Sequence, residues 1–177
     1  MPRRPVEELE AGRAFYAQLA PDLDVGHFAA MWHTFTVGHL LATDLDRIAR
    51  RHDLSIADLH LLGTIRIERP EQLRATDLAL TLHVCNAVLS ARIARLESQG
   101  LLVRTPSPAD RRAFQLTLTA DGAAKTDAAI ADISRSGAFA RRYRTLRDED
   151  RAALARIMGE LHNLLDRDFV GATRGKL

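Results

Sequence analysis

The chain has 177 residues, of which 46% are hydrophobic and 27% charged, and its net charge at pH 7 is only +2. These values are typical of a globular protein, and the sequence holds no apolar run of the roughly 18 residues that a membrane-spanning helix needs. The single cysteine, Cys85, excludes an internal disulfide, and residues 1–8 lack the apolar core of a signal peptide, so we expect a cytoplasmic protein.

Three helices are predicted in the first part of the chain. Residues 6–19 form a helical segment, and apolar residues at three- and four-residue spacing then predict a long amphipathic helix that ends near His52. Ser55 and Asp58 are spaced as a near match to a capping box, in which the two side chains satisfy backbone N–H groups at the start of a helix. The third helix therefore begins after Ser55, and it ends by Pro70.

Two further helices follow with a very short connection. Thr76 precedes a short helix at residues 77–82, and His83–Val84 form a tight turn. The next helix begins near Asn86 and carries apolar residues on one face. Gly100 is well placed to end it, because glycine adopts the left-handed conformation common after a helix.

The apolar pattern then changes to that of strands. Residues 101–104 form a short strand-like run, and residues 114–118 alternate between apolar and polar side chains as a half-buried strand does. The intervening residues 105–113 are rich in the residue types of turns. We therefore predict a two-stranded hairpin, which must pack on helices because an isolated hairpin is marginally stable.

Two long helices are predicted at the C-terminal end. Thr119 caps a helix that runs from residue 120 to about residue 144. Asp148 and Glu149 open the last helix, where acidic side chains favour the helix dipole.

This order of elements is that of a winged helix-turn-helix. In such a fold the second helix enters the major groove of DNA, and the loop of the hairpin, the wing, contacts the backbone or the minor groove. Residues 74–112 carry three more basic than acidic side chains, whereas the rest of the chain is about neutral. The excess of positive charge lies where phosphates would lie.

Four sequence runs in this region resemble the MarR family of bacterial regulators, in the same order and with spacing that needs no gap. The runs are Leu73–Ala79, Arg95–Arg104, Pro108–Arg112 and Leu116–Gly122. The resemblance implies a mainly α fold with a small β-hairpin wing, in which a winged helix-turn-helix lies between long N- and C-terminal dimerisation helices. It divides the chain into residues 1–52, 53–120 and 121–177, the first and last for dimerisation and the middle one for DNA binding.

The resemblance also implies a function. We expect a homodimer that binds a pseudo-palindromic operator in double-stranded DNA, most simply as a repressor. A small aromatic or phenolic ligand is expected to release this dimer from the DNA. Asp110 matches the family's acidic residue that helps to fix the wing loop, and Arg112 matches the arginine that reaches the minor groove. Arg111 is expected to contact a phosphate. The expected DNA-binding residues are Thr76, Asn86, Ala87, Ser90, Ala91, Arg92, Arg104, Ser107, Asp110, Arg111 and Arg112.

The recognition helix departs from the common pattern of the family. The arginine stands at Arg92 rather than at the position of Ala91, and apolar residues replace several polar ones. We expect Asn86 and Ser90, then Arg92, to contact bases, and Arg95 and Glu97 to be structural, through an ion pair or a cap.

The sequence gives less support to other functions. The motifs of phosphate loops, nucleophile elbows and zinc proteases are absent, so we expect neither an enzyme, a cofactor nor a bound metal. A redox-responsive regulator that acts through Cys85, and a winged helix that binds only proteins, stay open as alternatives. The expected ligand-binding residues are Trp32, His33, Phe35, His39 and His60.

Overall fold

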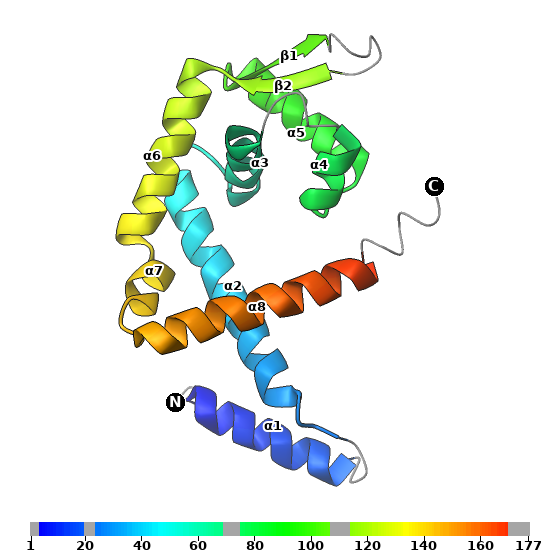
Figure 1. Ribbon diagram of the computed structural model, residues 1–177, viewed down its shortest axis with the longest axis vertical. Coiled ribbons are helices and arrows are strands. Elements are labelled where there is room, and N and C mark those ends of the chain that lie inside the picture. The colour runs from blue at the N-terminus through cyan, green and yellow to red at the C-terminus, as the bar shows by residue number, and fades with distance from the viewer. Residues whose placement is uncertain (1–3, 20–23, 69–74, 107–113, 170–177) are drawn as a thin grey trace. The chain divides into compact units, whose positions relative to one another are not determined.

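The computed structural model describes residues 4–19, 24–68, 75–106 and 114–169 (Figure 1). The elements follow in the order α1 (Pro5–Leu19), α2 (Phe28–Arg50), α3 (Ile56–Ile67), α4 (Ala75–Thr81), α5 (Asn86–Ser98), β1 (Leu102–Pro106), β2 (Phe114–Leu118), α6 (Ala120–Ser136), α7 (Ala138–Tyr143) and α8 (Asp148–Phe169). The predicted fold class is confirmed, since the chain is mostly helical with one small hairpin between its long helices. No helix in the described ranges is long and apolar enough to span a membrane.

The chain divides into two units, residues 1–43 and residues 44–177. The first unit holds α1 and most of α2, and its aromatic side chains pack on one another. The Tyr16 and Phe28 rings lie 4.9 Å apart, and Phe28 stacks on Trp32 at 6.4 Å. Phe28 is the buried centre of this group, with 8% of its surface exposed.

The second unit contains the winged helix-turn-helix. Helix α3 packs against α6 and β2, α4 against α5, and α5 against β1 (Figure 1). The helices meet in one hydrophobic core, because each turns a stripe of leucine and isoleucine toward the others. Its fully buried large side chains include Leu61, Leu62, Leu78, Leu89, Leu96 and Leu102.

The hairpin is antiparallel, with Leu102 opposite Leu118 and Pro106 opposite Phe114. Leu102 and Leu116 are buried on the face that meets the helices, whereas Val103 and Phe114 are exposed. The first strand extends two residues beyond the predicted residue 104, to Pro106.

One prediction about the helices is wrong. The expected continuous helix over residues 120–144 is interrupted at Gly137, and α6 and α7 are separate. The Asp44 carboxylate, from the last turns of α2, accepts hydrogen bonds from the backbone N–H groups of Ala138 and Phe139 and caps α7. A side chain at residue 137 would collide with the Ile133 carbonyl oxygen, which explains a glycine there.

Candidate nucleic-acid interface

The turn between α4 and α5 sets the start of α5. His83 adopts the left-handed conformation with φ 50°, and the Val84 N–H donates to the Ala79 carbonyl over 3.0 Å. This 6→1 hydrogen bond closes the C-terminal end of α4 and reverses the chain. Cys85 is the N-cap of α5, but its side chain makes no cap hydrogen bond. The first N–H groups of α5 therefore lack the side-chain cap that Ser55 supplies to α3.

The outer face of α5 is exposed and carries few large side chains. Leu89, Ile93 and Leu96 are buried against the core. The opposite face exposes Asn86, Ala87, Ser90 and Ala91, which were expected to meet DNA, together with Cys85 and Val88. Asn86 and Ser90 are the two of these whose side chains form full hydrogen bonds with bases or phosphates.

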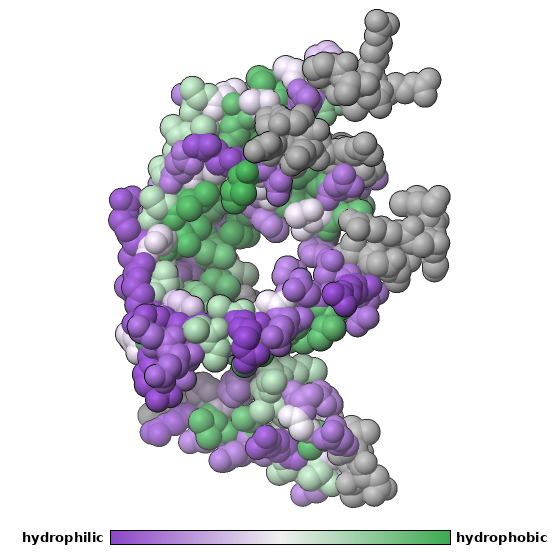
Figure 2. Space-filling model, viewed as in Figure 1, coloured by the Kyte–Doolittle hydropathy of each residue, from purple (hydrophilic) through white to green (hydrophobic). Residues whose placement is uncertain are grey.

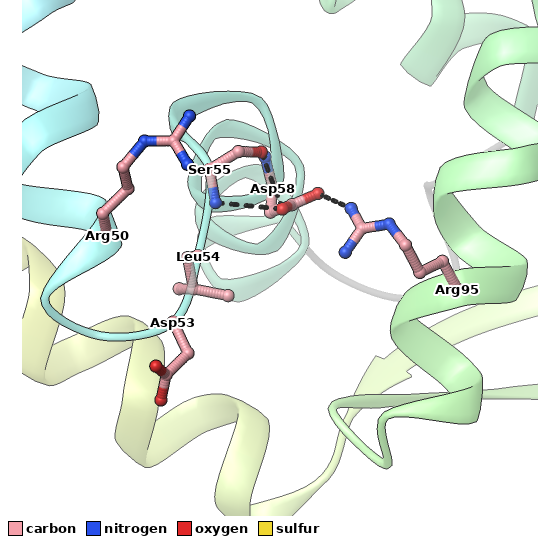
Figure 3. A pocket seen from close by; sticks show the side chains of 6 residues that line it. All are labelled: Arg50, Asp53, Leu54, Ser55, Asp58 and Arg95. Atoms are coloured by element: carbon pink, nitrogen blue, oxygen red, sulfur yellow. Dashed lines mark hydrogen bonds and ion pairs between the residues drawn. The ribbon is translucent and has the colours of Figure 1, made fainter.

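An ion pair links α5 to α3 (Figure 3). Asp58 lies in the first turn of α3, with only 3% of its surface exposed. Its carboxylate accepts hydrogen bonds from the Ser55 N–H at 3.0 Å and the Ser55 hydroxyl at 2.6 Å, and the Ser55 Oγ accepts the Asp58 N–H at 3.1 Å. The Arg95 guanidinium, from α5, donates to the other carboxylate oxygen. The predicted capping box and the predicted structural role of Arg95 are both confirmed.

The electrostatics of this pair favour the charged form of Asp58. Burial raises the pKa of Asp58, but the two hydrogen bonds from Ser55 and the Arg95 guanidinium outweigh it, so that the pKa lies below its usual value. A pocket of about 420 Å³ opens beside the pair and is also lined by Arg50, Asp53 and Leu54 (Figure 3). Two carboxylates and two guanidinium groups balance in its lining, which gives it no preference for one sign of charge.

Two other arginines expected at the DNA contact the protein itself. Arg104 is bound by Glu97, whose carboxylate accepts the Arg104 Nε–H at 2.9 Å and its backbone N–H at 3.2 Å. This pair ties β1 to α5, and it confirms that Glu97 is structural. Arg92 is half-buried and donates to the Ala57 carbonyl of α3 at 3.4 Å. Both guanidinium groups would have to reorient to bind a phosphate.

His60, on α3, lies near His83 and Arg92. Burial is the largest cause that lowers the pKa of His60, and the nearby charges of His83 and Arg92 add to it. His60 is therefore less readily protonated than a free histidine.

The described residues contain no group of three or more His, Cys, Asp or Glu side chains that could hold a metal ion.

The wing loop is outside the described ranges. Ser107, Asp110, Arg111 and Arg112 all lie in residues 107–113, which the structure does not describe. Thr76 lies in the first turn of α4, and its side chain is not described either. The strands on both sides place the ends of the loop, since Pro106 pairs with Phe114.

The expected ligand-binding residues are distributed over both units. His33, Phe35 and His39 are exposed on α2, with Phe35 at 71%, and His60 lies on α3 in the second unit. Trp32 is half-buried and lines a cleft of about 360 Å³ between α1 and α2, which none of the other four residues lines. The prediction missed the other residues of this cleft, since nothing in the local sequence pairs α1 with α2. They are Glu8, Ala11, Gly12, Phe15 and Phe28.

Comparisons with known proteins agree with this architecture. Residues 52–113 match the family model described as the MarR family. The HTH-type transcriptional regulator PecS of Dickeya dadantii (strain 3937) is 31% identical over 103 residues, which are 58% of this chain and 62% of that protein. The match thus spans less than two thirds of the length of the relative. Regulators of this family are not enzymes.

Solved structures share the fold at low identity. The MepR–DNA complex of S. aureus has a TM-score of 0.66 and 17% identity, covering 75% of this chain and 96% of that one. AbsC, a MarR family transcriptional regulator from Streptomyces coelicolor, has a TM-score of 0.67 and 22% identity, covering 81% of this chain and 96% of that one. CouR from Rhodococcus jostii RHA1 bound to p-coumaroyl-CoA has a TM-score of 0.62 and 21% identity, covering 81% of this chain and 90% of that one.

Proposed function

We propose that the chain belongs to the MarR family, whose model matches residues 52–113, and that it is a transcription regulator that binds double-stranded DNA. The observation that carries the proposal is the outer face of α5. It is exposed at Asn86 and Ser90, while Arg95, near the C-terminal end of α5, binds the buried carboxylate of Asp58 on α3. A helix that is held on a neighbouring helix and exposes its first turns is suited to the major groove, where a fixed position of the side chains is needed for recognition.

Within this proposal the contacts have separate roles. Asn86 and Ser90 contact base edges in the major groove, and Thr76, Ala87 and Ala91 lie against the DNA beside them. Arg111 binds a phosphate and Arg112 enters the narrow minor groove, as the resemblance to the family implies, with Asp110 and Ser107 shaping the loop. Arg92 and Arg104 contribute positive charge from behind the interface. Backbone contacts and groove shape carry much of the affinity, because α5 presents few polar side chains.

The proposed regulator acts as a homodimer. Helix α8 has an apolar stripe at three- and four-residue spacing whose members are all exposed on the single chain. The stripe comprises Leu154, Ile157, Met158, Leu161, Leu164 and Leu165. The face of α8 turned to the viewer in Figure 2 is mostly hydrophilic with one hydrophobic patch. A helix of this kind buries its stripe against a second copy, as two-fold dimers do.

A small effector completes the proposal. CouR is a structural neighbour bound to p-coumaroyl-CoA, and an aromatic or phenolic ligand that releases DNA would make this chain a repressor of the same general kind. Residues 1–52 and 121–177 then serve dimerisation, and residues 53–120 serve DNA binding.

The experiment is a titration of the promoter region of its own gene, by fluorescence anisotropy, over a series of salt concentrations. We expect saturable binding that falls steeply with salt, because the protein replaces counterions on the phosphates. Arg112→Ala should weaken binding at every salt concentration and lower the salt slope by about one. Arg13→Ala, at an exposed position on α1, is the matched control and should leave the titration unchanged.

Two results separate this function from the alternatives. A chain without salt-dependent DNA binding, in which Arg112→Ala is harmless, would be a winged helix that binds only proteins. If oxidation of the exposed Cys85 releases DNA and Cys85→Ser prevents that release, the regulator responds to redox state rather than to a ligand.

A further inference from the structure

The cleft between α1 and α2 in the first unit depends on a close approach of the two helices. Gly12 lies in the interior of α1, where glycine costs a helix about 1 kcal/mol relative to alanine. A Cβ atom at this position would stand only 2.8 Å from the Phe28 ring. Because no larger residue fits there without moving that ring, Gly12 sets how closely α1 approaches α2. The floor of the cleft is therefore set by packing and does not depend on a mobile loop.

The lining of the cleft is aromatic on its walls and acidic at one end. Phe15 of α1 and Phe28 and Trp32 of α2 supply the aromatic rings, while Glu8 is the one charged group in the lining. The volume of about 360 Å³ lies at the lower end of the range for small-molecule sites, which suits a molecule with one or two rings.

The charge around the cleft has the same sign as its lining. The described residues of the first unit carry four carboxylates, Glu7, Glu8, Glu10 and Asp24, against two arginines, Arg4 and Arg13. An anionic ligand would be repelled by Glu8. A cation gains from the carboxylate and from the electron-rich faces of the aromatic rings.

We propose that this cleft binds a small aromatic cation, whose ring lies against Phe15 and Trp32 and whose charge lies beside Glu8. The site differs in place and in charge preference from the balanced pocket beside Asp58. Binding there does not depend on the proposed regulatory function, which enters only in the question of whether the cation changes DNA binding.

The sole tryptophan of the chain is Trp32, so its fluorescence reports on this cleft alone. The full chain is titrated with benzyltrimethylammonium, and the matched compounds are benzyl alcohol as the neutral ring, phenylacetate as the anionic ring and tetramethylammonium as the cation without a ring. We expect a saturable fluorescence change, with the highest affinity for benzyltrimethylammonium.

Three variants assign the binding to the cleft. Glu8→Gln should weaken binding of the aromatic cation about two- to fivefold, as the loss of an exposed ion pair does, and should leave benzyl alcohol unchanged. Ala11→Leu fills the cleft from an exposed position and should weaken binding about tenfold or more. Ala17→Leu places the same side chain at an exposed position of α1 outside the cleft and should have no effect.

Several outcomes would overturn the proposal. They are equal or tighter binding of phenylacetate, unchanged binding in Ala11→Leu, and the absence of any saturable change. Trp32 fluorescence that depends on protein concentration and not on the cation would instead assign the cleft to contact with a second copy. The titrations contain no DNA, so failure of operator binding, measured separately, leaves their outcome unaffected.

Discussion

The ion pair between Asp58 and Arg95 gives the sharpest test of how α5, the proposed recognition helix, is held. Asp58→Ala removes the buried carboxylate that accepts two hydrogen bonds from Ser55 and the guanidinium of Arg95. The change leaves the exposed face of α5 untouched. It therefore separates the positioning of the helix from its direct contacts with DNA.

The expected cost follows from the geometry of the site. Loss of the capping-box interaction at the start of α3 costs about 1 kcal/mol of the free energy of unfolding. The bond to Arg95 adds about 1 kcal/mol, less than for a fully buried pair, because 47% of the Arg95 side chain is exposed to solvent. Asp58→Ala should thus lose about 2 kcal/mol, which lowers the Tm by about 4–8 °C in a chain of this size.

The assay is urea unfolding followed by circular dichroism, for the single variants Asp58→Ala and Arg95→Ala and for the double variant. Arg95→Ala should cost about 1 kcal/mol, and the two changes should show a coupling of about the same size. Glu160→Ala breaks an ion pair with Arg156 in which both side chains are more than half exposed, and it is the control that should leave stability within about 0.5 kcal/mol.

Operator affinity provides the second measurement. We expect Asp58→Ala to weaken DNA binding at temperatures where the variant is fully folded, because α5 loses its anchor on α3. A coupling near zero, or a loss no larger than that of Glu160→Ala, would refute the argument that this pair holds α5 on α3.

Three further predictions concern stability. Gly122→Ala would place a Cβ only 1.8 Å from the Leu101 carbonyl oxygen, so thermal unfolding should show a loss above about 2 kcal/mol, although alanine normally stabilises a helix. Gly100→Ala meets no atom within 4 Å but must adopt φ 71°, so it should lose only about 1–2 kcal/mol; a larger loss than that of Gly122→Ala would contradict both explanations. The pKa of Asp58 is lowered in the folded protein, hence its contribution to stability is present above the unfolded value near 4 and is lost as the pH falls through the folded value. Acid unfolding curves of Asp58→Ala should therefore be flatter below about pH 4 than those of the parent chain, and parallel curves would count against this assignment.

Much of the fold was predictable because the relevant interactions are local. The capping box of Ser55 with Asp58 joins residues three apart, and the left-handed Gly100 follows the helix that it ends. Thr119 was likewise predictable as the N-cap of α6, where its hydroxyl accepts the Gly122 N–H at 2.9 Å. Such patterns involve residues only a few positions apart, so they can be recognised directly in the sequence.

The candidate site was predictable in part. The sequence predicted a helix that begins near Asn86, which α5 confirms, and the two residues on it expected to contact bases, Asn86 and Ser90, are exposed. It could not tell that Arg104 is paired with Glu97, or that Arg92 reaches the Ala57 carbonyl 35 residues earlier. An arginine has the same character in the sequence whether it faces a phosphate or a neighbouring helix.

By itself the sequence determined the order of the elements, the winged helix-turn-helix and the resemblance to the MarR family. Only the tertiary structure decided where α6 ends, because the Asp44 carboxylate that caps α7 comes from 94 residues earlier in the chain. The tertiary structure also decided which carboxylate holds Arg95, and that Gly12 brings α1 against Phe28. Hydrophobic periodicity and caps depend on near neighbours, whereas ion pairs and close approaches depend on segments that folding brings together.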